Sequence, residues 1–235
     1  MSSKDREAEV LRGNAGLPTA ASTTSPLKRL FTDPAYALRL VRFALHLPVR
    51  METEDRRVLE DVTFPYYRVL PGLRSVLFVG CDWYTRHYER AFFRGTDYWT
   101  IDPAPRARRF AGRQHVVAPL ERLDEFFPEQ RFDVIVCNGV FGYGLDGREQ
   151  CERAFGLCHS RLVDGGHFLL GWADIPERTP VALSQIASLM LFSPFLFPPL
   201  GVSRYVTDTP YRHTYDFYCK PRVSSAGSSC SPATS

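Results

Sequence analysis

Short apolar runs and longer amphipathic segments alternate through the middle of the chain. Residues 76–79 form a continuous apolar run that closes at Gly80, which is typical of a parallel strand buried on both faces. Between 83 and 92, apolar and aromatic residues recur at three- and four-residue spacings, the period of one helix face. A second short run, 98–101, then ends at Asp102. This order predicts a strand, a glycine turn, a helix and a second strand.

The same alternation continues toward the carboxyl terminus. Residues 115–118 can supply a third strand, and residues 149–162 have the apolar spacing of an amphipathic helix. The other expected strands are 132–137, 167–172 and 214–219. Strands that alternate with helices predict an α/β fold, with a mostly parallel sheet and right-handed crossovers.

Ligands of such sheets bind beyond the carboxyl ends of the strands. This rule places the turn at 80–83, Asp102, Ala118 and Asn138 along one edge of the predicted sheet. An acidic residue about twenty positions after a glycine turn is the arrangement that binds a nucleotide ribose. The pattern therefore predicts a nucleotide-like ligand at Gly80 and Asp102.

The flanking segments differ from this central region. Residues 1–27 are polar and lack the apolar centre of a signal peptide, so we expect a disordered arm and a cytoplasmic protein. A small helical attachment is predicted over 28–62, with one helix from Pro34 to about Leu47 and a highly charged one over 52–62. The main domain is expected over 63–221, and the low-complexity stretch 222–235 is expected to be disordered.

Residues 181–200 carry no charged side chain and end in a dense apolar cluster. Their length would suit a membrane span, but Pro194, Pro198 and Pro199 interrupt a helix. We expect no transmembrane segment, and instead a helix followed by an apolar lid, within an insertion at 180–201. The same stretch is a candidate contact for a membrane surface or a partner chain.

Composition excludes some classes of partner. The formal net charge of +3 is too small to argue for nucleic acid. The six cysteines include no CxxC pair and no cluster with the spacing of metal ligands, so no metal is expected. We expect a globular protein that acts on a small molecule, as a monomer or a homodimer.

The order of the motifs resembles that of the class I S-adenosylmethionine-dependent methyltransferases. Four segments carry the resemblance, VLFVGCDWYT, WTIDP, FDVIVCNGVFGYGLD and LVDGGHFLLGW, within about two thirds of the chain. The resemblance implies a Rossmann-like, mostly parallel seven-stranded sheet with helices on both faces. It also implies S-adenosylmethionine as the cofactor.

In this family, the first turn faces the methionine part of the cofactor, and the acid after the second strand binds the ribose hydroxyls. Residues after the third and fourth strands border the adenine and the reacting methyl group. The cofactor-binding residues that this implies are Val79, Gly80, Cys81, Asp82, Asp102, Pro103, Ala118, Leu120, Asn138 and Gly139.

Candidates for the acceptor side are aromatic. Phe141 and Tyr143 follow the fourth strand, and Tyr66 and Tyr67 precede the first, where they could equally attach the helical cap to the sheet. The catalytic residues stay open. Asn138 and His213 are candidates, and His213 would be either a general base or a hydrogen-bonded structural histidine.

Several positions depart from the family pattern. Phe78 and Ala118 replace acids that the family commonly has, and Asp82 and Tyr84 replace the second and third glycines of the first motif. Tyr84 could fill part of the space of the cofactor, whereas Asp82 could bind its ammonium group.

We therefore predict S-adenosylmethionine-dependent methyl transfer to a small apolar or aromatic molecule. The protein would act mainly by holding donor and acceptor in line. The alternative is a catalytically inactive binding or scaffold protein with the same fold.

Overall fold

The computed structural model describes residues 34, 37–38, 41–42 and 50–222. The chain divides into two compact units, Met1–Met51 and Glu52–Ser235. In the first unit, residues 34, 37–38 and 41–42 are helical, within the range of the first predicted helix. The predicted arm at 1–27 and residues 223–235 of the predicted tail lie outside the described residues.

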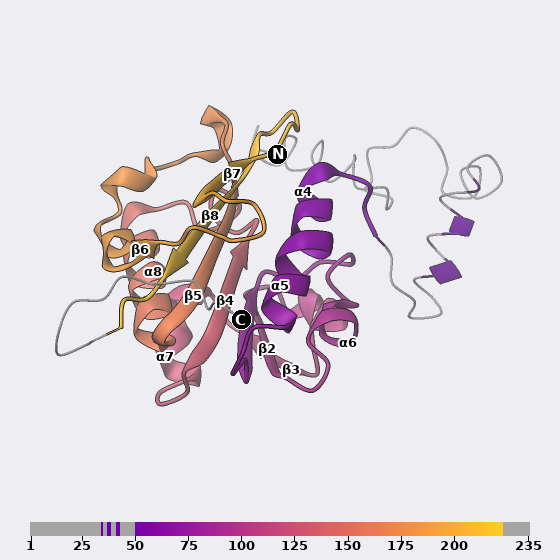
Figure 1. The fold of residues 1–235 in the computed structure, drawn as a ribbon, viewed down its shortest axis with the longest axis horizontal. Helices are drawn as coiled ribbons and strands as arrows, with labels where there is room; N and C mark the ends of the chain where they lie inside the picture. Colours follow the sequence, from indigo (N-terminus) through magenta and orange to yellow (C-terminus); the bar gives the residue numbers. More distant parts are fainter. Residues whose placement is uncertain (1–33, 35–36, 39–40, 43–49, 223–235) are drawn as a thin grey trace. The chain divides into compact units, whose positions relative to one another are not determined.

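The second unit is built on one eight-stranded sheet (Figure 1). Its strands are β1 (Ser75–Val79), β2 (Asp97–Asp102), β3 (Gln114–Val117), β4 (Phe132–Asn138), β5 (Leu162–Ala173), β6 (Ser193–Pro194), β7 (Arg204–Val206) and β8 (His213–Cys219). The strand order is β3-β2-β1-β4-β5-β8-β6, and β7 also pairs with β8. Neighbours among β1 to β5 are parallel, and β8 is antiparallel to β5. The predicted α/β fold with a mostly parallel sheet is confirmed.

The sheet has one strand more than expected because its edge beside β8 is split. The short strand β6 pairs with Tyr218 and Cys219, whereas β7 pairs with the stretch from Thr214 to Asp216. Pro194 lies in β6, at an outer edge where the sheet needs no further N–H donor.

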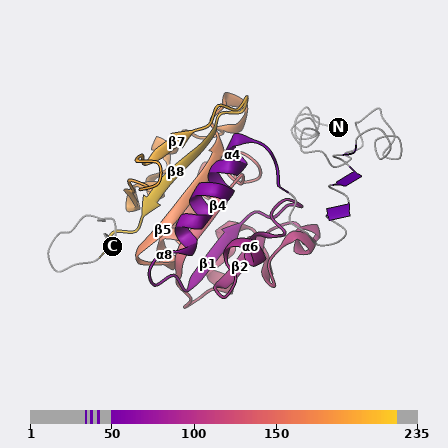
Figure 2. The same cartoon turned by 45° about the vertical axis from the view of Figure 1, so that its right-hand side comes forward.

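Helices cover both faces of the sheet, as predicted (Figures 1 and 2). They are α4 (Glu54–Arg57), η1 (Val58–Thr63), α5 (Phe64–Arg68), α6 (Tyr88–Phe92), η2 (Pro105–Phe110), η3 (Leu120–Arg122), α7 (Leu123–Phe126), α8 (Arg148–Arg161), η4 (Pro176–Arg178), η5 (Leu183–Gln185) and η6 (Ala187–Leu191). Alternate residues of β1 point to opposite faces. Val76 and Phe78 share a core cluster with Phe64, whereas Leu77 shares the other with Phe155 of α8.

The elements α4, η1 and α5 form one continuous helix across the first face (Figure 2). The highly charged helix predicted over 52–62 therefore starts at Glu54 and continues to Arg68. Its middle part, η1, is a π-helix, in which Thr63 Oγ1 donates a hydrogen bond to the carbonyl of Val58 (2.9 Å). Single π-turns within α-helices frequently occur at functional sites.

Tyr66 and Tyr67 lie near the end of this helix. Tyr67 is fully buried, and its ring is edge-on to His167 at 5.6 Å. Tyr66 is half-buried, with its ring 4.8 Å from that of Phe197. These contacts favour attachment of the helix to the sheet over contact with a substrate.

The apolar stretch 181–200 forms two 3-10 helices and β6 in place of the predicted helix. The carboxylate of Glu152 accepts the backbone N–H groups of Ala187 and Ser188 (2.7 Å each), which holds η6 against α8. Ile186 and Phe192 are buried in the core, so much of the apolar character reflects core packing. Across the described part of the chain, no helix is long and apolar enough to cross a membrane.

Candidate functional site

The carboxylate of Asp102, at the end of β2, links β2 to the turn that follows β1. Its Oδ2 accepts the backbone N–H of Cys81 (2.8 Å), and its Oδ1 accepts that of Ala104 (2.8 Å). The residue is half-buried. Because a carboxylate offers about four acceptor positions, each oxygen keeps capacity for a further donor. The structure thus brings the predicted Gly80 turn and Asp102 together.

Gly80 is required by both conformation and space. Its φ is +85°, in the left-handed region that favours glycine. A Cβ on Gly80 would lie 2.9 Å from Cγ2 of Val140. The preceding Val79 is buried in the core, so only its backbone borders this turn.

The turn after Gly80 delays the next helix. The helix predicted over 83–92 is shorter, and α6 begins at Tyr88. Asp82 Oδ1 accepts the backbone N–H of Trp83 (2.7 Å), and Thr85 Oγ1 bonds both the N–H (3.1 Å) and the carbonyl (2.8 Å) of Asp82. Such local bonds from Asp and Thr side chains compete with helix formation.

The predicted adenine-side residues lie after β3 and are apolar. Ala118 and Leu120 are buried, and the backbone N–H of Ala118 donates to the carbonyl of Asp102 (3.2 Å). Pro103 is exposed next to Asp102. A ligand at this edge would therefore meet mainly polar groups of Asp102 and the backbone, because the side chains of Ala118 and Leu120 are buried.

Asn138 and His213 form a buried pair at the ends of β4 and β8. Oδ1 of Asn138 lies 2.9 Å from Nε2 of His213, and both residues are less than 10% exposed. The bond requires a proton on Nε2 when the amide oxygen is the acceptor, which leaves the lone pair of a neutral imidazole on Nδ1. In the sequence these two residues are separate candidates, and the structure brings them into contact.

The pair depends on Gly171, which is opposite Asn138 in β5. A Cβ on Gly171 would overlap Oδ1 of Asn138 and lie 3.1 Å from Nε2 of His213. Glycine at this position therefore provides the space in which the pair forms.

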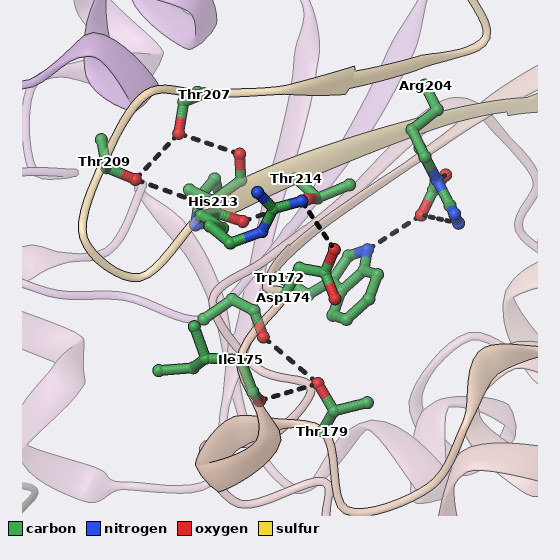
Figure 3. A network of polar contacts seen from close by, with 12 residues as sticks. Trp172, Asp174, Ile175, Thr179, Arg204, Thr207, Thr209, His213 and Thr214 are labelled. Carbon is green, nitrogen blue, oxygen red and sulfur yellow. Dashed lines mark hydrogen bonds and ion pairs between the residues drawn. The ribbon is translucent and has the colours of Figure 1, made fainter.

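The backbone around His213 is fixed by a loop of threonines (Figure 3). Thr209 Oγ1 accepts the N–H of His213 (3.1 Å), and Thr207 Oγ1 donates to its carbonyl (2.9 Å). The preceding Arg212 has φ of +45°, which is uncommon outside glycine. Strained residues of this kind cluster at functional sites.

The two aromatic residues of the loop after β4, Phe141 and Tyr143, differ in their exposure. Phe141 is fully buried in the core, so it offers no exposed surface to a substrate. Tyr143 is 42% exposed, and the guanidinium of Arg178 lies over its ring at 4.5 Å. Gly139, also predicted at the site, is exposed and has φ of +69°. Of the two aromatic side chains, only Tyr143 is available to a ligand.

A buried charged cluster on α4 and η1 is the main feature that sequence analysis missed. Asp55, Arg56 and Glu60 are 3%, 7% and 2% exposed. Nε of Arg56 lies 3.4 Å from Oδ2 of Asp55, and its Nη1 donates to the hydroxyl of Tyr88 (3.3 Å). That hydroxyl donates to Oε1 of Glu60 (2.9 Å).

The cluster also contacts β8 and the Gly80 turn. The hydroxyl of Tyr211 donates to Oδ1 of Asp55 (3.0 Å), and the hydroxyl of Tyr215 donates to its carbonyl (2.8 Å). The guanidinium of Arg56 lies 4.1 Å from the ring centre of Tyr84. Tyr84 therefore packs against Arg56, and the cluster lies between the first turn and the His213 end of the sheet.

Burial and charge act against each other in this cluster. Burial alone would raise the pKa of Asp55, but Arg56, His213 and the hydroxyl of Tyr211 hold it below its usual value. Burial lowers the pKa of His213, Asp55 opposes this effect, and Arg56 adds to it, so His213 is neutral at neutral pH. A neutral imidazole can accept a proton on its second ring nitrogen.

The pattern of α4 and η1 contains a signal that could have identified the cluster. Asp55, Leu59 and Val62 recur at four- and three-residue spacing, so a charged residue lies in line with apolar ones. Charged residues are rarely buried without partners. A carboxylate on an apolar helix face therefore indicates a buried polar site.

Other chemistries find less support in the described part of the chain. No group of three or more His, Cys, Asp or Glu residues there could hold a metal ion. Burial and the nearby Asp102 raise the pKa of the Cys81 thiol to about 12, so Cys81 is not an activated nucleophile.

The sequence matches no family model and no curated protein. Among solved structures, the N-methyltransferase NodS from Bradyrhizobium japonicum is 18% identical, with a TM-score of 0.53, and the match covers 73% of this chain and all of NodS. A TehB-like SAM-dependent methyltransferase from Corynebacterium glutamicum is 16% identical, with a TM-score of 0.52 and coverage of 80% and 97%. TrmN from Thermus thermophilus is 13% identical, with a TM-score of 0.52 and coverage of 79% and 53%.

At these identities the likeness shows the fold. It agrees with the order of strands and with the resemblance of the motifs. The protein has the fold of the S-adenosylmethionine-dependent methyltransferases.

Proposed function

We propose that this protein binds S-adenosylmethionine and transfers its methyl group to a small molecule. The observation that carries the proposal is the link between Asp102 and the Gly80 turn, at the strand ends of this fold. The modest net charge of +3 supports a small acceptor over nucleic acid.

The residues at this edge fit the cofactor. The carboxylate of Asp102 keeps acceptor positions for ribose hydroxyls, and a base would lie over the end of β3, beside the backbone of Ala118. The half-buried carboxylate of Asp82 suits an ammonium group. When bound, S-adenosylmethionine supplies a methyl group that is already activated by a positively charged sulfur.

The protein itself would position the methyl donor and the acceptor, and would provide a proton acceptor. Nδ1 of His213 would take the proton from an acceptor hydroxyl or amine, and Asn138 would hold the imidazole in the required tautomer. The partly exposed ring of Tyr143 supports an aromatic or apolar acceptor.

Binding is tested first by calorimetric titration with S-adenosylmethionine and S-adenosylhomocysteine. We expect Asp102→Asn to weaken binding of both about tenfold or more, because one ionised acceptor is lost. Asp97→Asn is the matched control, since Asp97 begins the same strand, is exposed, and accepts hydrogen bonds from the side chains of Trp99, Gln114 and Gln130. It should leave both affinities unchanged.

Absence of binding to the wild-type protein at millimolar ligand would reject the proposal. The inactive binding or scaffold protein, in which Tyr84 occupies part of the site, would then be the better interpretation. Equal losses in the Asp102 and Asp97 variants would reject the assigned position of the ribose.

A further inference from the structure

The guanidinium of Arg56 is buried with most of its donors unused. The side chain is 8% exposed. Among the described residues it makes one hydrogen bond, from Nη1 to Tyr88, and its Nε has no hydrogen-bond acceptor. A guanidinium has five N–H groups. Four of them therefore lack an acceptor in the described part of the protein.

The group is nevertheless charged. Burial alone would lower the pKa of Arg56, but the surrounding Tyr84, Tyr88, Tyr215 and Asp55 keep it well above its usual range. Buried charges are usually both paired and hydrogen-bonded. Asp55 fulfils this only in part, because its Oδ2 is 3.4 Å from Nε while its Oδ1 bonds Tyr211.

Arg204 provides a comparison, because its guanidinium forms a complete ion pair within the protein. Its Nε and Nη2 donate to the two oxygens of Asp216 at 2.5 and 3.0 Å. That pair uses the fork of the guanidinium fully on one side. Arg56 has no such partner, and its Nη2 makes no hydrogen bond to any described residue.

The surroundings of Arg56 indicate which kind of ligand group would accept its remaining hydrogen bonds. Its guanidinium stacks on Tyr84, which follows Asp82 in the turn that Asp102 holds. Asp82 lies two residues before Tyr84 in the same turn, so a cation and a carboxylate both border this turn. This is the charge pattern that complements an α-amino acid group, with its carboxylate and its ammonium.

We propose that Arg56 binds a carboxylate that arrives with the ligand, through its free Nη2 edge, beside the first turn. The inference rests on the proposed function. The carboxylate has two possible sources, the methionine end of the cofactor or a carboxylated acceptor. In both cases the site takes a planar anion that accepts two parallel hydrogen bonds.

The test compares two ligands that differ in this group. S-adenosylhomocysteine has the amino acid end, and 5′-methylthioadenosine lacks it. For a carboxylate from the cofactor, we expect Arg56→Gln to weaken S-adenosylhomocysteine at least tenfold and 5′-methylthioadenosine less than twofold. Arg57→Gln is the matched control, because Arg57 is exposed and its side chain donates to the carbonyl of Glu52.

For a carboxylate from the acceptor, benzoate is the probe, added to protein saturated with S-adenosylhomocysteine. It should raise the melting temperature of the wild type and of Arg57→Gln, and leave that of Arg56→Gln unchanged. If Arg56→Gln does not fold, Arg56→Lys keeps the charge without the fork and should give the same ordering with smaller losses.

Equal weakening of both nucleosides would show a structural role for Arg56 and overturn the inference. So would unchanged S-adenosylhomocysteine binding together with identical benzoate shifts in all variants. If the wild type binds neither nucleoside, the proposed function fails. Benzoate added to the protein without a nucleoside then decides the inference: a rise in melting temperature that depends on Arg56 supports it, and no such rise overturns it.

Discussion

Gly171 shows how one missing side chain determines a polar contact. The Asn138–His213 pair occupies the space where a Cβ of residue 171 would be. The pair therefore depends on a residue that has no chemistry of its own.

We expect Gly171→Ala to destabilise the protein by about 1–3 kcal/mol, the usual cost of overpacking. Urea unfolding measures the change. Gly156→Ala is the control, because a Cβ there meets only Cβ of Ser188 at 3.8 Å. It should be neutral or stabilising, since alanine favours a helix over glycine by about 1 kcal/mol.

A double-mutant cycle separates the clash from a general effect on β5. In an Asn138→Ala background, Gly171→Ala should cost much less, because the overlapping oxygen is gone. Equal costs in both backgrounds would contradict the role of Gly171 in providing space for the pair.

Residue-level prediction from the sequence worked where the signal was local. Gly80 and Asp102 were found because each ends an apolar run, and the structure brings them together. Asp55 and Tyr211 are 156 positions apart, and Arg56 and Tyr88 are 32 apart. Such contacts arise when a helix packs on the sheet, and no local pattern states them.

At the level of elements, the π-turn η1 sets the orientation of the charged cluster. It lies between α4, which carries Asp55 and Arg56, and α5, which carries the core residues Phe64 and Tyr67. A π-turn contains one residue more per turn than the surrounding helix, as its i→i+5 bonding requires. The two halves of the helix are therefore offset from the phase of a regular α-helix.

Insertion of one alanine after the exposed Asp61 should rotate α4 by about 100° relative to α5, because the π-turn already accommodates one extra residue. Because α5 keeps its core packing, the protein should still fold cooperatively. Arg56 would lose Tyr88, and binding of S-adenosylhomocysteine should fall at least tenfold by calorimetry.

Asp61→Ala places an alanine at the same point without changing the length of the helix. It should bind like the wild type. If both variants bind equally well, the phase of α4 does not matter for the site.

The predicted helices were wrong in two places where side chains form hydrogen bonds with the backbone. The helix after Gly80 starts late because Asp82 and Thr85 bond the backbone of the turn. The stretch 181–200 forms 3-10 helices because Glu152 fixes its backbone against α8. Apolar periodicity could not indicate either effect, although it predicted the order of the sheet.

For the whole molecule, buried histidines make stability depend on pH. Burial lowers the pKa of His167 to about 4, and burial also lowers that of His213. An unfolded histidine takes up a proton near pH 6.5. Between these values the unfolded chain binds more protons, so the free energy of unfolding falls as the pH decreases from 7 toward 4.

We expect His167→Phe to make this decline shallower. A phenyl ring keeps the contacts with Tyr67 and Phe195 but cannot be protonated. Urea unfolding at a series of pH values measures the slope. The decline should not vanish, because His115, His159 and His213 also have lowered pKa values. An unchanged slope would show that His167 does not contribute.

The space shared by Asn138 and Gly171 also limits how this sequence can diverge. A homologue with a larger residue at position 171 must have a smaller one at position 138, since the two cannot occupy the same volume. The two positions lie on neighbouring strands and should therefore covary. Among related chains, those with asparagine at 138 and glycine at 171 should be the ones that retain the contact between Asn138 and His213.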